Sequence, residues 1–174
     1  FCHVSKKTPA PLDLDEPRRL ALAVGQLGLR HVVVTSVTRD DLADGGAAVF
    51  GATVRAIRDS GSKATVELLI PDFRGAEASL KTIAASTSDN LGHNLETVPR
   101  LYTLRPQADY ARSLHVLGQI KKENPGIRTK SSLMLGLGER QDEVIQVLKD
   151  LRKVSCDFLT LGQYLRPSLK QTPV

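Results

Sequence analysis

Long apolar runs and cysteines are both scarce in this sequence. No apolar run approaches the roughly 18 residues that a membrane-spanning helix needs, so we expect no membrane span. Only Cys2 and Cys156 are present in 174 residues, which is too few for a disulfide scaffold. The cysteine usage therefore predicts a reducing, cytoplasmic compartment, and by composition alone Cys156 reads as a small buried hydrophobe.

Positive charge and aromatic residues are also too sparse for a nucleic-acid-binding face. The 24 Lys and Arg residues against 19 Asp and Glu give a net charge of only +5. Four Phe, three Tyr and no Trp leave few side chains that could stack on bases. We expect no nucleic-acid partner, and the modest positive charge suits an acidic protein partner as well.

The start of the chain has neither a methionine nor a targeting segment. The first residue is Phe1, the single methionine is Met134, and no basic-then-apolar segment opens the sequence. We expect the chain to be cut from a longer protein.

What is present is an alternation of short apolar runs with amphipathic segments. The apolar, partly β-branched runs predict five strands. The predicted strands cover residues 31–35, 64–70, 90–95, 129–135 and 157–161. Their starts recur at intervals of about 30 residues, the length of a strand, a helix and two short loops.

Apolar stripes with helical spacing lie before and between these strands. Asp15 is placed to cap the first helix, Pro17 suits its first turn and Gly28 suits its end. The stripes consist of Leu20, Val24 and Leu27; Phe50, Val54 and Ile57; Leu80, Ile83 and Ala84; Leu114, Leu117 and Ile120; and Val144, Val147, Leu148 and Leu151. We interpret all of them as core-packing faces.

This alternation predicts the α/β class, with a parallel sheet and right-handed crossovers. An open doubly wound sheet and a closed barrel both fit the pattern. Polar residues follow each predicted strand, namely Thr35 and Ser36, Asp72 and Arg74, Asn94 and Glu96, Glu139, and Gln163. In a barrel all five strand ends meet at one mouth, whereas in an open sheet only those near the switch point meet. The pattern therefore favours the barrel.

Three short motifs contain chemistry-bearing residues without fixing a function. GLGERQ at 136–141 follows a strand as a dinucleotide-binding turn does, but it lacks the third glycine. TSVTRDDLADGG at 35–46 holds three carboxylates, which form either a solvated loop or a divalent-metal site. In HNLE at 93–96, strand alternation places Asn94 and Glu96 on one face, where they need each other or a ligand as partners.

Five longer strings occur in order, each at a predicted strand end. They are VVVTSVTRDDLADGGA, PDFRG, HNLETVPRLY, LMLGLGE and LTLGQYLRPS. Together they closely resemble the lipoyl synthases, a family of radical S-adenosylmethionine (SAM) enzymes. The resemblance covers essentially the whole chain.

The resemblance implies one incomplete radical SAM core domain over residues 1–174, folded as a partial (β/α)6 TIM-like barrel and truncated at both ends. It implies SAM and two 4Fe–4S clusters as cofactors, one binding SAM and one donating sulfur. FCHV resembles the end of the family's CxxxCxxC motif, which makes Cys2 a cluster ligand. The implied reaction inserts two sulfurs at C6 and C8 of a protein-bound octanoyl chain.

Site roles follow residue by residue from the resemblance. Thr35 and Ser36 would contact the methionine moiety of SAM, and Asn94 and Glu96 its ribose or methionine polar groups. The glycine-containing segment from Ser132 through Gly136 to Glu139 would meet adenine, although Ser132 replaces a usual glycine. Gln163 and Tyr164 would contact adenine or substrate. No catalytic residue is assigned within the chain.

The implied partners are octanoylated lipoyl-carrier domains, as in 2-oxoacid dehydrogenase E2 subunits and the glycine cleavage H protein, with a flavodoxin or ferredoxin as electron donor. Only one radical-cluster cysteine, Cys2, lies in the chain, so we expect the chain alone to be inactive. The alternatives are another radical SAM enzyme, a phosphate-handling barrel, or a non-catalytic barrel that docks carrier proteins.

Overall fold

The computed structural model describes residues 8–174, in which five strands form one parallel sheet. The strands are β1 (His31–Thr35), β2 (Thr65–Leu69), β3 (Asn90–Gly92), β4 (Arg128–Leu135) and β5 (Phe158–Gln163). Each pairs in parallel with the next strand along the chain, in the order β1-β2-β3-β4-β5. Four strands match the predicted runs closely, but β3 ends three residues earlier than predicted.

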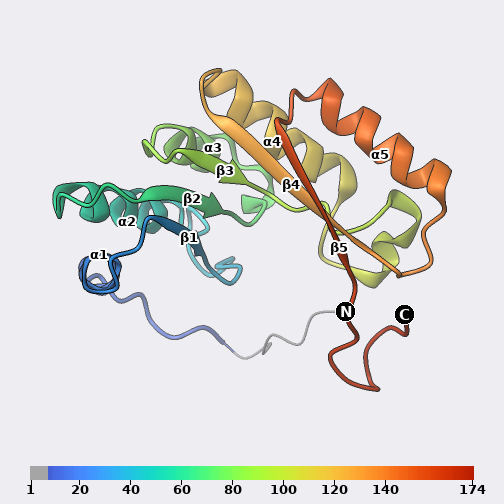
Figure 1. The fold of residues 1–174 in the computed structure, drawn as a ribbon, viewed down its shortest axis with the longest axis horizontal. Coiled ribbons are helices and arrows are strands. Elements are labelled where there is room, and N and C mark those ends of the chain that lie inside the picture. The colour runs from blue at the N-terminus through green and yellow to red at the C-terminus, as the bar shows by residue number, and fades with distance from the viewer. Residues whose placement is uncertain (1–7) are drawn as a thin grey trace.

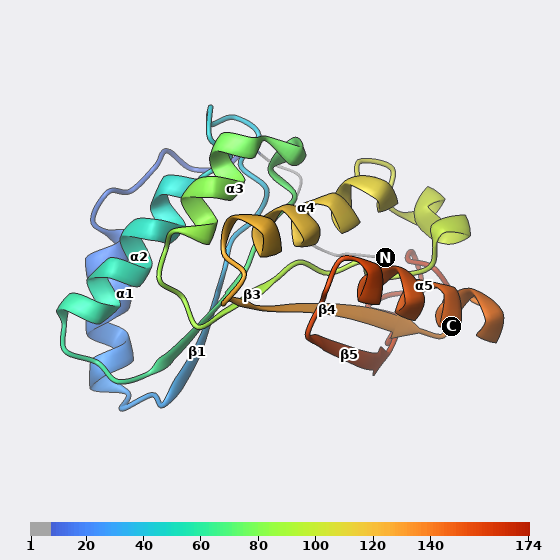
Figure 2. The same cartoon turned by 90° about the horizontal axis from the view of Figure 1, so that it is seen from above.

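Five α-helices flank the strands, and the predicted stripes lie in them except for Leu27, which follows α1 and is 70% exposed, so its predicted place in the core is wrong (Figures 1 and 2). They are α1 (Glu16–Gln26), α2 (Ala47–Asp59), α3 (Glu77–Ala84), α4 (Tyr110–Glu123) and α5 (Gln141–Lys153). Two short 3-10 helices, η1 (Phe73–Gly75) and η2 (Pro99–Leu104), were not predicted.

Asp15 is at the N-cap of α1 as predicted, but its carboxylate accepts hydrogen bonds from Arg18 and Arg19 instead of capping the backbone. None of the helices that the structure describes is long and apolar enough to cross a membrane.

Sequential strand order decides between the two architectures that the sequence left open. A doubly wound sheet reverses its strand order at a switch point, and this sheet contains no such reversal. Successive right-handed crossovers keep the helices on one face, as in a barrel wall. Within residues 8–174, β1 and β5 form the two edges and do not pair with each other.

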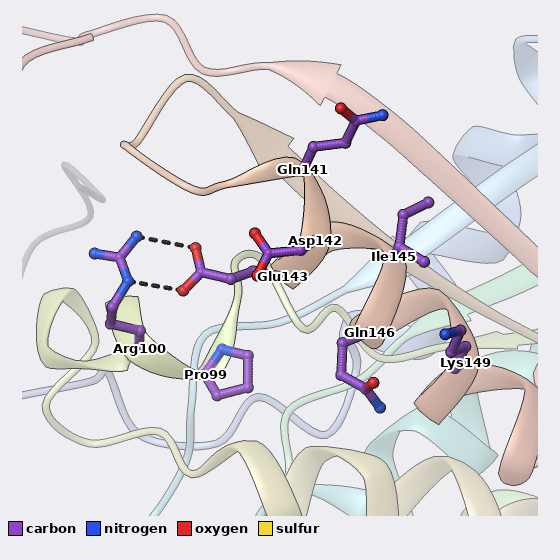
Figure 3. A pocket seen from close by; sticks show the side chains of 8 residues that line it. All are labelled: Pro99, Arg100, Gln141, Asp142, Glu143, Ile145, Gln146 and Lys149. Atoms are coloured by element: carbon purple, nitrogen blue, oxygen red, sulfur yellow. Dashed lines mark hydrogen bonds and ion pairs between the residues drawn. The ribbon is translucent and has the colours of Figure 1, made fainter.

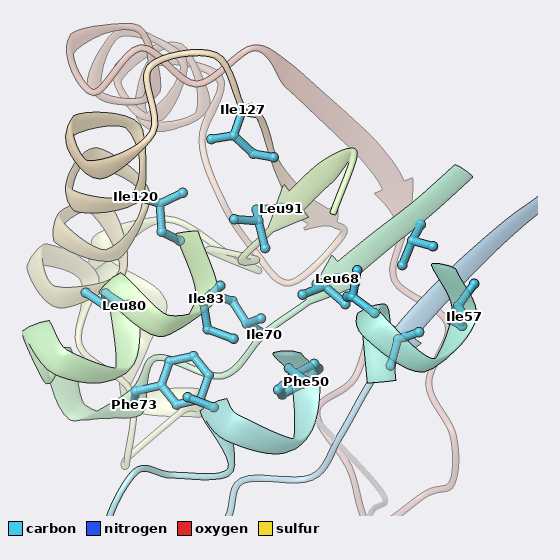
Figure 4. Packing of buried hydrophobic residues seen from close by; sticks show 14 of the residues in the cluster. Phe50, Ile57, Leu68, Ile70, Phe73, Leu80, Ile83, Leu91, Ile120 and Ile127 are labelled. Carbon is cyan, nitrogen blue, oxygen red and sulfur yellow. The ribbon is translucent and has the colours of Figure 1, made fainter. Parts of the chain in front are cut away.

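The core lies between the helices and the face of the sheet that they cover (Figure 4). Val66 and Leu68 of β2 are completely buried there, packed within the same cluster as Ile57 of α2 and Ile83 of α3. A second cluster joins β4 to α4 and α5. Its buried members are Leu95, Val98, Leu117, Leu133, Val147, Leu151 and Cys156. Burial of these stripes supplies most of the driving force for folding.

The opposite face of the sheet carries a partly buried ion pair that the sequence did not reveal. Glu67 of β2 receives a hydrogen bond from Lys130 Nζ at 2.9 Å, and its side chain is only 8% exposed. His31 of β1 lies 3.8 Å away, on the other side of the same carboxylate. A carboxylate this buried requires a charged partner, so the pair links β2 to β4 across β3.

A repeated side-chain contact fixes the amino end of the sheet. Asp89, just before β3, accepts the Val66 N–H of β2 at 2.7 Å and Arg58 Nη2 of α2 at 2.6 Å. The same arginine donates to the Ala64 carbonyl at 2.8 Å. We call this arrangement an aspartate clasp, because one carboxylate joins a strand, its neighbour and the preceding helix.

The second clasp has the same form one repeat later. Asp157, just before β5, accepts the Thr129 N–H of β4 and Lys121 Nζ of α4, both at 2.7 Å. Lys121 also donates to the Ile127 carbonyl at 2.6 Å, as Arg58 donates to Ala64. Partial burial opposes ionisation of Asp157, yet these hydrogen bonds hold its pKa below the usual value.

Removing the second clasp should destabilise the protein. Asp157→Ala leaves the N–H of the fully buried Thr129 without its acceptor, so we expect a loss of about 1–3 kcal/mol in the free energy of unfolding. Chemical denaturation measures the loss. Asp142→Ala is the matched control, because the Asp142 side chain is 73% exposed and its ion pair is with Arg140, another exposed side chain. Equal stability of the two variants would contradict the role given to Asp157.

The clasp also predicts a pH dependence. Because the pKa of Asp157 is lower in the folded state, its contribution is present above the unfolded value of about 3.9 and is lost as the pH falls through the folded value. The stability of Asp157→Ala should therefore fall less than that of the unmodified protein between about pH 6 and about pH 3.

Candidate functional site

Glu96 lies beside β4 at the carboxyl edge of the sheet, although β3 has already ended. Its N–H donates to the Ser132 carbonyl at 2.9 Å, and its carbonyl accepts the Met134 N–H at 2.8 Å. Its φ of 67° lies in the left-handed region, which is uncommon for a residue with a side chain. The alternation that predicted a shared face for Asn94 and Glu96 is therefore wrong, since these residues follow the strand instead of continuing it.

The side chains of Asn94 and Glu96 nevertheless meet. Burial raises the pKa of Glu96, while a hydrogen bond from the Asn94 side chain and the charge of Arg105 oppose the shift. Arg105 also donates to the Leu95 carbonyl at 2.9 Å, as does the hydroxyl of Tyr102. The half-buried carboxylate of Glu96 thus lies among polar groups that include Asn94 and Arg105. The sequence analysis identified Asn94 but not Arg105.

Gly136 and Gln163 are also brought together, at the ends of β4 and β5. Gly136 has a φ of 106°, and a Cβ placed on it would lie 2.5 Å from Gln163 Nε2. Gln163 Nε2 donates to the carbonyls of Leu135 and Tyr164, at 3.1 and 3.0 Å. Both the backbone angle and the close approach require glycine at position 136.

The turn that follows Gly136 is held from within by a carboxylate. Glu139 accepts the Gly136 N–H at 2.6 Å and the Leu137 N–H at 2.9 Å. Partial burial raises the pKa of Glu139, but these backbone hydrogen bonds outweigh it and the net pKa is lowered. Because its amides are already occupied, this turn does not provide the phosphate cradle of a dinucleotide-binding motif.

Thr35 and Ser36 end the edge strand β1, away from the residues just described. Both are exposed, and the Ser36 hydroxyl donates to the Val37 carbonyl at 2.9 Å. β2 and β3 lie between β1 and β4, so the structure does not bring these two residues into contact with Ser132 or Gly136. The predicted cluster ligand Cys2 lies outside the described residues.

The carboxylates at 40, 41 and 44 each have a partner within the protein. Asp40 pairs with Arg74 at 2.9 Å, and Asp41 with Arg39 at 2.8 Å. Asp44 accepts the N–H groups of residues 46 and 48 at the start of α2. In the part of the chain that the structure describes, no three His, Cys, Asp or Glu side chains are grouped to hold a metal ion. The divalent-metal interpretation of this loop is therefore wrong.

Two further polar residues of the predicted mouth are structural. His93 is buried, with Nδ1 2.9 Å from the Ile70 carbonyl and Nε2 3.1 Å from the Ser113 hydroxyl. Burial lowers its pKa, so the ring is neutral at physiological pH. Tyr164 is buried as well, and its hydroxyl donates to the Thr172 carbonyl at 3.0 Å. The structure thus brings Asn94 together with Glu96 after β3, and Gly136 together with Gln163 at the ends of β4 and β5.

Comparison with solved structures identifies the fold. Methylornithine synthase (PylB) matches with a TM-score of 0.67 and 14% identity, over 92% of this chain and 46% of that chain. Coproporphyrinogen III oxidase (HemN) from Escherichia coli, a radical SAM enzyme, matches with a TM-score of 0.62 and 16% identity, over 91% of this chain and 42% of that chain. These likenesses confirm the predicted α/β fold, a partial barrel of parallel strands and helices.

Comparison of sequences identifies the family. The lipoyl synthase of Geotalea daltonii is 55% identical over 174 residues, which are 100% of this chain and 59% of that protein. The chain thus spans about 60% of the length of the curated relatives that it matches. A model described as the radical SAM superfamily matches residues 1–151. Because this match covers most of the chain, the protein belongs to the radical SAM superfamily.

Proposed function

We propose that the complete protein containing this chain is a lipoyl synthase, a sulfurtransferase that inserts two sulfurs at C6 and C8 of a protein-bound octanoyl chain. The observation that carries the proposal is the 55% identity to a lipoyl synthase over the whole length of the chain. The five motif strings support it, because each one lies at or follows the carboxyl end of a strand. Barrel enzymes place their chemistry at this edge.

The residues at this edge fit SAM as a ligand. Gly136 has no side chain, so the Gln163 side chain packs directly against the backbone at the end of β4, and we propose this Gly136–Gln163 contact as the part of the edge that meets adenine. Glu96 and Asn94 offer a carboxylate and an amide to hydroxyl and amino groups. Thr35 and Ser36 are exposed at the end of β1 and remain proposed contacts for the methionine moiety.

Cluster binding is proposed for Cys2 together with cysteines beyond this chain. Within residues 8–174 no suitable group of ligands exists, so the described barrel wall is assigned no cluster of its own. When bound, a 4Fe–4S cluster and SAM supply a 5′-deoxyadenosyl radical, and a second cluster supplies sulfur. The described residues would bind SAM, orient it and exclude water from it.

The proposed partners follow from the proposed reaction. The substrate would be an octanoylated lipoyl-carrier domain of a 2-oxoacid dehydrogenase E2 subunit or of the glycine cleavage H protein. A flavodoxin or ferredoxin would deliver electrons in the cytoplasm.

We propose residues 1–174 as a single radical SAM core domain. A different radical SAM activity and a non-catalytic, carrier-docking barrel are the alternatives that the experiments must separate.

The proposed activity predicts two products in an anaerobic assay of the complete protein. With SAM, a reductant and an octanoylated carrier domain, we expect a lipoyl group on the carrier together with 5′-deoxyadenosine, detected by mass spectrometry. Formation of 5′-deoxyadenosine without the lipoyl group would indicate another radical SAM enzyme. Formation of neither product, together with no iron bound after reconstitution, would favour the docking barrel.

Cluster ligation by Cys2 predicts a change in iron content. The reconstituted complete protein should hold roughly eight irons, and Cys2→Ala should retain roughly four, because one 4Fe–4S cluster loses a thiolate ligand. Cys156→Ala is the matched control, since the Cys156 thiol is buried and donates to backbone carbonyls. Unchanged iron in Cys2→Ala would remove Cys2 from the ligand set.

Ligand contact by the Asn94–Glu96 pair predicts weaker SAM binding in its variants. Glu96→Gln and Asn94→Ala should each weaken binding by about 1–3 kcal/mol in an anaerobic titration, because a half-buried polar partner of the ligand is lost. Glu77→Gln, on the exposed first turn of α3, serves as the control. Full SAM affinity in both variants would reassign the pair to bracing the barrel wall.

A further inference from the structure

We propose that Arg100 is a positioning residue, which holds the 136–139 turn in the form that receives SAM. The inference rests on the proposed function, in which this turn lies against SAM. It assigns a role to a side chain that the sequence analysis left without one.

The contacts of Arg100 join η2 to the turn and to α5, and Figure 3 shows its ion pair with Glu143 of α5. Nη2 donates to the Gly138 carbonyl at 2.8 Å. Nε and Nη2 donate to the two carboxylate oxygens of Glu143 at 2.7 and 2.9 Å, in a bidentate pair. Glu143 lies in the first turn of α5 and also accepts the Arg140 N–H at 2.7 Å. One guanidinium therefore fixes both the turn and the start of the helix that follows it.

The turn needs such support because of its glycines. Gly136 and Gly138 have φ values of 106° and 98°, and glycine has more backbone freedom to lose than any other residue. Glu139 holds the amides of residues 136 and 137. The carbonyl of Gly138 is held by Arg100 instead. The two charged side chains thus fix different parts of one turn.

Arg100 also connects the turn to the segment that carries Glu96. Glu96 is bonded through its backbone to Ser132 and Met134 of β4, and η2 begins three residues later at Pro99. The segment from Glu96 to Arg100 is therefore joined to β4 and the turn after it at two places. Glu96 is bonded to the strand itself, and Arg100 is bonded to Gly138 in the turn that follows the strand. A shift of the turn is therefore coupled to the position of the Glu96 segment.

The Arg100–Glu143 ion pair is suited to hold the turn at neutral pH. The Glu143 side chain is only 11% exposed, compared with 48% for Arg100, so solvent screens the pair incompletely. The hydrogen bond from Arg100 holds the pKa of Glu143 at about 2, so the carboxylate stays ionised at neutral pH.

The test uses Arg100→Gln and Arg100→Lys in the complete, reconstituted protein. Arg140→Gln is the matched control: the Arg140 side chain pairs with Asp142 and lies 3.4 Å from Glu143, whereas the Gly138 carbonyl is bound by Arg100. Two quantities are measured: the Kd for SAM by anaerobic titration, and amide hydrogen exchange at 136–139 in the absence of SAM.

We expect Arg100→Gln to raise the Kd for SAM about tenfold, the equivalent of roughly one misplaced hydrogen bond, and to speed exchange in the turn. At saturating SAM, kcat should stay close to that of the unmodified protein while KM for SAM rises. Arg100→Lys should recover only part of the affinity, because an ammonium cannot form the bidentate pair. Arg140→Gln should change neither quantity.

Unchanged exchange and unchanged SAM affinity in Arg100→Gln would overturn the inference. If the unmodified protein itself fails to bind SAM, the proposed function fails, and the exchange measurement alone still decides whether Arg100 holds the turn. Should Arg100→Gln fail to fold, the same two measurements on Arg100→Lys decide, with full affinity and slow exchange counting against the proposal.

Discussion

Two aspartate clasps hold the amino end of the sheet, and they fix β2 and β4, two of the strands whose other ends form the carboxyl edge. Asp89 and Asp157 each join the first residues of one strand to the chain entering the next strand and to a cation on the preceding helix. Arg58 and Lys121 play the same part six residues before Ala64 and Ile127. The barrel wall thus contains a helix–strand unit that occurs twice with the same aspartate–cation contact, although the sequence itself shows no repeat.

The residues that stabilise the sheet and the residues proposed to contact the ligand lie at opposite ends of the strands. At the amino end, the clasps and the Glu67–Lys130 pair fix the register of β2 and β4. At the carboxyl edge, the chain uses backbone forms that cost free energy, such as the left-handed Glu96 and the glycines of the 136–139 turn. Charged side chains compensate there, because Glu139 and Arg100 form hydrogen bonds with the backbone of these glycines. This division is typical of barrel enzymes, in which the carboxyl edge performs the chemistry.

The candidate site combines predictions that hold with others that fail for identifiable reasons. Alternation correctly led to Asn94 and Glu96 as a pair, but for the wrong reason, since β3 ends at Gly92 and a turn brings them together. The acidic loop after β1 was open to interpretation as a metal site because the sequence does not show how its carboxylates are paired. Asp40 pairs with Arg74, which lies more than thirty residues away in the sequence. Arg100 carried no motif signal, because its partners Gly138 and Glu143 lie about forty residues away in the sequence.

The sequence by itself determined the alternation of strands and helices, the helix faces that enter the core, and the family resemblance of the strand-end motifs. These features depend on local periodicity and on short strings, which a single sequence displays directly. Only the tertiary structure decided the strand order, the burial of Glu67 against Lys130, and the contacts that Glu139 and Arg100 make with the 136–139 turn. The physical reason is that a charged side chain reads as solvent-exposed until its partner is known, and here the chain fold supplies partners from distant segments.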